Sequence, residues 1–126
     1  MTGAEAVRAY IDAFNAEDLD ALTAVLTDDV EIQSQRGLIE GRDEARRWAT
    51  RNPAGWLYQR LVLEDVDDRG SHAIARVRKQ WAWRDESKPA DEQEIFFVAT
   101  IRGGLIARWA PFEDHDAAVR AAGISS

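Results

Sequence analysis

Three side chains late in the chain have the chemistry of acid–base groups: Glu94, Glu113 and His115. A carboxyl group in apolar surroundings has a raised proton affinity, which suits proton transfer near neutral pH. Tyr10 supplies a phenol that can donate a hydrogen bond to a substrate oxygen. Asp114 offers another interpretation of this corner, because an aspartate before a short helix is typical of an N-cap, and His115 would then be exposed in the first turn. Capping and catalysis both remain open here.

Five tryptophans form a second group of candidates: Trp48, Trp56, Trp81, Trp83 and Trp109. Large aromatic side chains commonly fill a core, so packing alone accounts for them. However, Trp81 and Trp83 are two residues apart and share one strand face, and aromatic walls with a few polar groups are typical of small-molecule pockets. We predict that Trp48, Trp81, Trp83 and Trp109 line a pocket, with core packing as the alternative.

The composition excludes several classes of function. Among 126 residues, 23 are Asp or Glu and 16 are Lys or Arg, so the formal charge is −7 and no nucleic-acid partner is expected. The chain has no cysteine, and its two histidines, His72 and His115, are too far apart for a metal motif. Without a glycine-rich phosphate loop either, we expect no metal and no cofactor.

Neither a secretory leader nor an apolar run of about 20 residues is recognisable, so no membrane partner is expected. We predict one cytoplasmic domain, residues 1–126.

Helices are expected mainly in the first half of the chain. Val7, Tyr10, Ile11 and Phe14 recur with helical spacing and form one apolar face. Asp18 is placed to cap a second helix.

From Val30 the period changes to two, which predicts a strand with Val30, Ile32 and Ser34 on one side. A loop bracketed by Gly37 and Gly41 follows. A third helix is then expected over Gly41–Asn52, with Trp48 on its buried stripe.

The second half reads as strands, and a short helix closes the chain. The expected elements are strands Leu57–Val66, Ala73–Arg84, Glu92–Arg102 and Leu105–Phe112, then a helix over Asp114–Ala122. Helices gathered early and hairpin-connected strands late indicate an α+β fold, with helices on one face of a bent sheet.

The hairpin turn at Gly103-Gly104 sets the expected faces of the last two strands, because paired glycines suit a two-residue turn. Regular pairing places Val98 beside Trp109 and Phe96 beside Pro111, with the two glutamates further along the same face. The opposite face would carry these apolar side chains: Ile95, Phe97, Ala99 and Ile106. A sheet that is apolar on both faces needs cover on both sides. We therefore expect a homodimer through the outer sheet face.

Three stretches of the chain resemble the nuclear transport factor 2-like superfamily, in its SnoaL-like branch. The residues that carry the resemblance are Tyr10–Leu22 with Leu26–Glu31, then Ile39–Ala45, then Gly104–Trp109 running into Phe112–Asp114 and Ala117–Gly123. The resemblance implies a cone-shaped, curved antiparallel or mixed sheet wrapped around the N-terminal helix. It also implies a pocket between them, floored by Tyr10 and Phe14.

The resemblance also bears on the chemistry. Steroid isomerases of this superfamily have a tyrosine where this chain has Tyr10, but their base position falls on Ser34 and their second acid on Phe96. Neither residue can replace a carboxyl group, so steroid isomerase chemistry is not expected. The epoxide hydrolases need an Asp–Arg–Asp arrangement around a water. Here Arg60, Arg76 or Arg78 with one of the two glutamates would be a crude version, although alternate arginines on a strand also describe a solvated face.

Two functions follow as hypotheses. The first is a SnoaL-like protein that binds a small apolar or aromatic molecule and acts as an isomerase, cyclase or lyase. In it Tyr10 binds a substrate oxygen, and Glu94, Glu113 or His115 moves the proton. Ligand contacts would come from these residues: Phe14, Ser34, Trp48, Trp81, Trp83, Phe96, Val98 and Trp109. The second is a non-catalytic binding or dimeric association module that has lost its acids. An acid group within hydrogen-bond reach of Tyr10 would favour the first.

Overall fold

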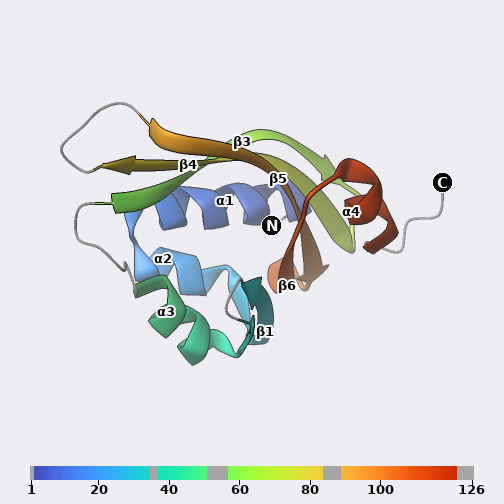
Figure 1. Cartoon of the computed structure of the whole chain (residues 1–126). Helices are drawn as coiled ribbons and strands as arrows, with labels where there is room; N and C mark the ends of the chain where they lie inside the picture. Colours follow the sequence, from blue (N-terminus) through green and yellow to red (C-terminus); the bar gives the residue numbers. More distant parts are fainter. Residues whose placement is uncertain (1, 35–36, 51–56, 84–88, 122–126) are drawn as a thin grey trace.

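A computed structural model describes residues 2–34, 37–50, 57–83 and 89–121, which contain four helices and six strands (Figure 1). In chain order the elements are α1 (Gly3–Ala16), α2 (Leu19–Ala24), β1 (Leu26–Ser34), β2 (Gly37–Glu40), α3 (Arg42–Thr50), β3 (Leu57–Asp68), β4 (His72–Trp83), β5 (Pro89–Arg102), β6 (Leu105–Phe112) and α4 (His115–Ala121).

Side-chain caps fix where the first two helices begin. The Thr2 hydroxyl accepts a hydrogen bond from the Glu5 amide at 3.1 Å, and the Glu5 carboxylate accepts one from the Thr2 amide at 3.0 Å. This capping box satisfies two amide groups that the first turn would leave unpaired. Asp18 caps α2 by accepting from the Ala21 amide at 3.1 Å, which confirms the predicted cap.

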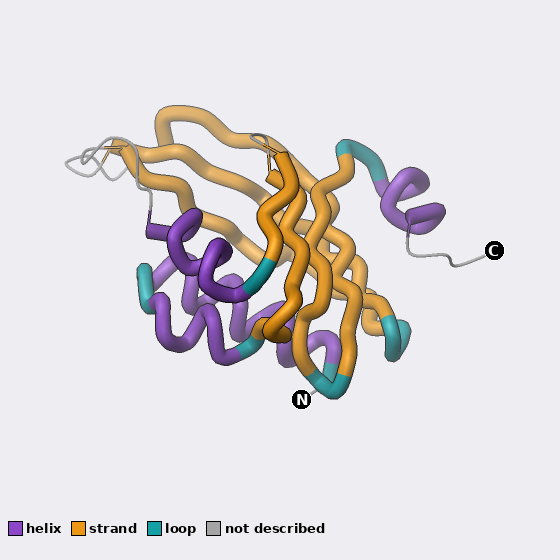
Figure 2. The backbone as a smooth tube through the Cα atoms, turned by 90° about the horizontal axis from the view of Figure 1, so that it is seen from below, coloured by secondary structure: helices purple, strands orange, loops and turns teal. Residues whose placement is uncertain are grey.

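The six strands form one mixed sheet with the order β2-β1-β6-β5-β4-β3. Only the β1–β6 pair is parallel among these described strands. The sheet is not closed, and it curves around α1, with α2 and α3 beside that helix (Figures 1 and 2). The predicted α+β fold, a curved mixed sheet around the N-terminal helix, is confirmed.

Two details at the β1 end differ from the sequence interpretation. β1 begins at Leu26, four residues earlier than the alternation indicates. The loop expected between Gly37 and Gly41 is instead the edge strand β2, which pairs antiparallel with β1. A four-residue strand beginning at a glycine is too short for its alternation to be recognised.

A β-bulge in β6 overturns the predicted faces of the last hairpin. The tight turn forms as expected, with φ of 62° at Gly103 and 79° at Gly104. Ile101 then pairs with Ile106, but Thr100 pairs with Arg108, so Ala107 is the extra residue. A bulge adds one residue to one strand only, and a shift of one residue reverses which side chains share a face.

The predicted distribution of the β5 and β6 side chains between the two faces of the sheet is therefore wrong. Trp109 pairs with Ala99, not with Val98, and Pro111 pairs with Phe97, not with Phe96. The residues expected on the outer face belong to the main core beneath α1: Ile95, Phe97, Ala99 and Ile106. Phe96 and Val98 lie on the opposite, outer face, with Ile74 and Ala118 of α4.

Candidate functional site

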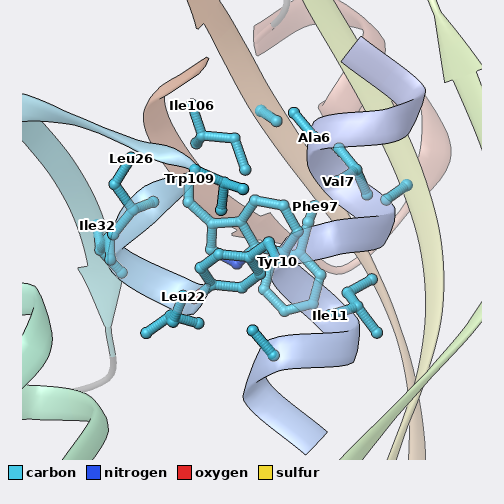
Figure 3. Packing of buried hydrophobic residues seen from close by; sticks show 14 of the residues in the cluster. Ala6, Val7, Tyr10, Ile11, Leu22, Leu26, Ile32, Phe97, Ile106 and Trp109 are labelled. Carbon is cyan, nitrogen blue, oxygen red and sulfur yellow. The ribbon is translucent and has the colours of Figure 1, made fainter. Parts of the chain in front are cut away.

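A stack of three aromatic rings occupies the space between α1 and the inner face of the sheet. The ring centroids of Tyr10 and Trp109 are 4.3 Å apart, and those of Trp109 and Phe97 are 4.8 Å apart. Their exposed fractions are 1%, 2% and 8% for Tyr10, Trp109 and Phe97. Figure 3 shows the three rings in contact, surrounded by aliphatic side chains of α1, β1 and β6. Around these three rings, the space between α1 and the sheet is filled by packed side chains.

Burial fixes the protonation state of the Tyr10 phenol. Desolvation raises the pKa of Tyr10 well above its ordinary value, because the phenolate would lose its hydration. The group therefore remains a neutral phenol throughout the physiological pH range. A neutral phenol can donate a hydrogen bond, but it is a poor base.

Toward the C-terminal end of α1 the aromatic surface becomes partly exposed. Phe14 lies one helical turn beyond Tyr10 on the same face, and its ring centroid is 6.4 Å from that of Trp48 on α3. Both side chains are half-buried and pack against the core cluster, as does Ile95 of β5. The aromatic surface thus runs from the buried stack outward to two rings that solvent reaches.

Lys79 adds a cationic group to the inner face at this same end. Ala73, Ala75 and Val77 alternate along β4 and are fully buried, and Lys79 follows them two residues on, half-buried. It pairs across the strands with Leu61 and Gln93. Partial burial lowers the pKa of the Lys79 ammonium through desolvation. The alternation of β4 places Lys79 on the same face as Val77, which is the signal in the sequence that marks this residue.

Asn15 holds the end of α1 against β3. Its side-chain amide donates to the Leu61 carbonyl at 2.7 Å, and its amide oxygen accepts from the Leu61 N–H at 2.8 Å. These two bonds join residues 46 positions apart in the chain. They fix the position of Phe14 relative to the sheet, since the two residues are adjacent. Nothing in the sequence pattern marks Asn15 for this role.

The three acid–base candidates do not meet Tyr10. Glu94 is exposed on the outer face and accepts two hydrogen bonds from Arg76, at 3.0 and 2.9 Å. Glu113 is exposed beyond the end of β6. His115 is also exposed; its ring is inclined at 67° to that of Phe96, with 5.6 Å between the two ring centroids.

The neighbouring Asp114 accepts from the Ala117 amide at 2.7 Å and so caps α4. The capping interpretation of this corner is confirmed.

Some of the predicted ligand-contact residues lie away from the aromatic stack, and others are not among the residues that the structure describes. Phe96 and Val98 are on the opposite face of the sheet from Trp109. The side chains of Ser34, Trp81 and Trp83 are outside the described residues, as is the whole of Trp56. The structure therefore brings together Tyr10 and Trp109, and separately Phe14 and Trp48.

Neither a metal centre nor a membrane span is found in the part of the chain that the structure describes. Its His, Asp and Glu side chains form no group of three that could hold a metal ion. None of its helices has the length and hydropathy needed to cross a lipid bilayer.

The sequence matches the family model of the SnoaL-like domain over residues 7–109. The match covers most of the chain, so the protein belongs to this family. The match begins within α1, includes the aromatic stack and ends at Trp109. No curated protein matches the sequence.

Solved structures with the same fold extend this result. One is an uncharacterized cystatin-fold protein from Novosphingobium aromaticivorans, with 23% identity, a TM-score of 0.74, and coverage of 89% of this chain and 98% of that one. An epoxide hydrolase from M. tuberculosis, described as LEH-like, has 19% identity and a TM-score of 0.73, covering 87% and 80%. A hypothetical protein from Catenulispora acidiphila with a ketosteroid isomerase-like fold was solved with trimethylamine; it has 16% identity and a TM-score of 0.74, covering 98% and 96%. At these identities the likeness establishes the fold alone.

Proposed function

We propose that this SnoaL-like protein binds a small apolar or aromatic molecule at the partly exposed end of its inner aromatic surface. Phe14 and Trp48 would hold the apolar body of the ligand. Lys79, on the same face of the sheet, would provide a positive charge or a hydrogen-bond donor for a ligand oxygen. In this function the protein binds its ligand, and Glu94, Glu113 and His115 transfer no proton.

One observation carries the proposal: the half-buried pair Phe14–Trp48, 6.4 Å between ring centroids, continues a fully buried aromatic stack. Half-buried rings can gain contact area when a ligand covers them, and burial of apolar area is favourable. Aromatic walls with a few polar groups are typical of small-molecule sites. The trimethylamine in the C. acidiphila structure is consistent with a fold that accepts small organic molecules.

Binding is favoured over acid–base catalysis by the positions of the acid candidates. A general acid or base must come within about 3 Å of the proton it transfers. Glu94 is held by Arg76 on the far side of the sheet, and Glu113 and His115 are exposed. This arrangement supports the binding-module hypothesis over the isomerase, cyclase or lyase hypothesis that used these groups.

The test is a fluorescence titration with 1-naphthol, a neutral aromatic probe. Trp48→Ala should weaken binding by about 1–2 kcal/mol, because the ring's contact area is lost. Leu38→Ala is the matched control, since Leu38 is an exposed apolar side chain on β2, with 46% of its surface exposed. Equal affinity in the wild type and both variants would contradict the proposal. A large loss of naphthol affinity in Glu94→Gln would also contradict the proposal, because it would show that Glu94 belongs to the binding site.

The homodimer expected through the outer sheet face rested on Ile95, Phe97 and Ile106, and these side chains belong to the inner core. Pairing of two copies therefore stays a prediction from the sequence.

A further inference from the structure

A groove of about 310 Å³ lies on the outer face of the sheet, between β3 and the start of α4. Six residues line it: Asp65, Asp67, Ile74, Arg76, Phe96 and His115. Its volume is at the lower end of the range of small-molecule pockets, about 300–1,000 Å³. The sheet separates this groove from the aromatic stack, so the two sites are distinct.

A bulge in β3 directs two carboxylates into the groove. Leu63 pairs with Val77 of β4 and Asp65 pairs with Arg76, so Glu64 is the extra residue. After this bulge Val66 packs against the inner core, and Asp65 and Asp67 line the outer groove. Bulges often re-aim side chains in this way.

The charges in the groove do not cancel. Arg76 is engaged by Glu94, at 3.0 and 2.9 Å, and Asp67 by Arg69 at 2.8 Å. Asp65 has no hydrogen bond or ion pair to any side chain in the described ranges; its interaction with Arg76 is longer-range attraction. A net negative charge therefore remains where Asp65 lines the groove, and a cation would neutralise it.

The groove also offers an apolar and aromatic surface. Ile74 is 3% exposed and packs with Val98 and Ala118 of α4. Phe96 is half-buried, and the His115 ring stands nearly perpendicular to it, at 67° with 5.6 Å between centroids. Since α4 is anchored by the fully buried Ala118, this wall of the groove is fixed in place.

We propose that the outer groove binds a small organic cation, an ammonium group carried on an apolar or aromatic body. The ammonium group lies at Asp65, with Asp67 beside it, and the body lies on Ile74 and Phe96. A neutral molecule of the same shape lacks the electrostatic part, and an anion is repelled.

The test compares three probes of nearly the same shape by NMR titration of the whole protein: benzylammonium, benzyl alcohol and benzoate. Benzylammonium should shift the resonances of Ile74, Phe96 and His115 in a saturable way, and benzoate should not. The order of affinity should be benzylammonium, then benzyl alcohol, then benzoate. Equal binding of the three probes would overturn the proposal, as would shifts confined to Tyr10 and Trp109. Absence of any shift, as when a second copy covers the groove, would overturn it too.

Two variants locate the charge. Asp65→Asn should weaken benzylammonium by about fivefold, the scale expected for one exposed ion pair, and leave benzyl alcohol unchanged. Asp43→Asn is the matched control, because Asp43 is an exposed carboxylate on α3. An equal effect of both substitutions would reduce the result to overall charge and overturn the site. The melting temperatures should agree, since both side chains are exposed.

Discussion

The inner and outer faces of β4 are made from alternating residues of one strand, yet they are built in opposite ways. On the inner face, Ala73, Ala75 and Val77 are fully buried. On the outer face, Arg76 and Arg78 are exposed and held by carboxylates of the neighbouring strands. Burial against α1 contributes most to stability on the first face, while the second carries charge at little energetic cost. The two faces of β4 can therefore be altered independently.

The largest difference between the two faces is expected when a charge is placed on each face in turn. Phe97 is 8% exposed and stacks on Trp109, so Phe97→Asp should lose more than about 4 kcal/mol of unfolding free energy. Phe96→Asp, one residue away on the outer face, should lose about 1–2 kcal/mol. Urea unfolding followed by circular dichroism measures both. Similar losses would mean that the two faces are not distinct.

On the inner face, two tryptophan substitutions should differ in their loss of unfolding free energy, because the two rings are buried to different depths. Trp109→Ala removes a ring that is 2% exposed, and should cost about 3–5 kcal/mol. Trp48→Ala removes a half-buried ring and should cost about 1–2 kcal/mol. Thermal and urea unfolding of the two variants, compared with the wild type, test this ranking. If Trp48→Ala destabilises as much as Trp109→Ala, the partly exposed end is core and not a binding surface.

Burial of Tyr10 also predicts a stability loss at alkaline pH. The pKa of its phenol is raised in the folded state, so the folded protein binds the proton more tightly than the unfolded chain. Stability is therefore fully present below pH 10, the ordinary value for tyrosine, and falls as the pH rises above it, by up to about 1.4 kcal/mol per pH unit. Tyr10→Phe should lack this contribution. The measurement is unfolding free energy at pH 9 and 11 for both proteins, and parallel losses would refute the assignment.

The smallest effect is expected for the outer ion pair. The Nη2 atom of Arg76 lies 2.9 Å from Oε2 of Glu94, and the two side chains are 52% and 44% exposed. Arg76→Ala should cost less than about 1 kcal/mol, and the difference should shrink in 1 M salt. Glu94→Gln serves as the matched variant that removes the pair from the other side. A loss that persists in salt would show that the pair does more than screened surface attraction.

The helices and the turn could be predicted because each depends on local chemistry. Val7, Tyr10 and Ile11 are buried as their spacing indicated, since helical periodicity directly reports a buried face. Asp18 and Asp114 are caps, as short acceptors at these positions favour.

The faces of β5 and β6 could not be predicted, because one residue decides them. Ala107 is the bulge residue, and alanine is compatible with either face, so the alternation shows no break there. That single extra residue moved Phe96 and Val98 away from Trp109. The bulge at Glu64, which places Asp65 in the outer groove, is hidden among acidic residues in the same way. Sequence periodicity therefore identified strands here more reliably than it identified their neighbours.

The two hydrogen bonds between Asn15 and Leu61 have a consequence for the behaviour of this protein at high concentration. β3 is twelve residues long and lies at the edge of the sheet, where unpaired backbone groups can recruit a strand from another molecule. Asn15 occupies both the N–H and the carbonyl of Leu61, so an incoming strand cannot pair continuously past that residue. The same side-chain amide that positions α1 thus interrupts the exposed edge of β3 and disfavours edge-to-edge aggregation.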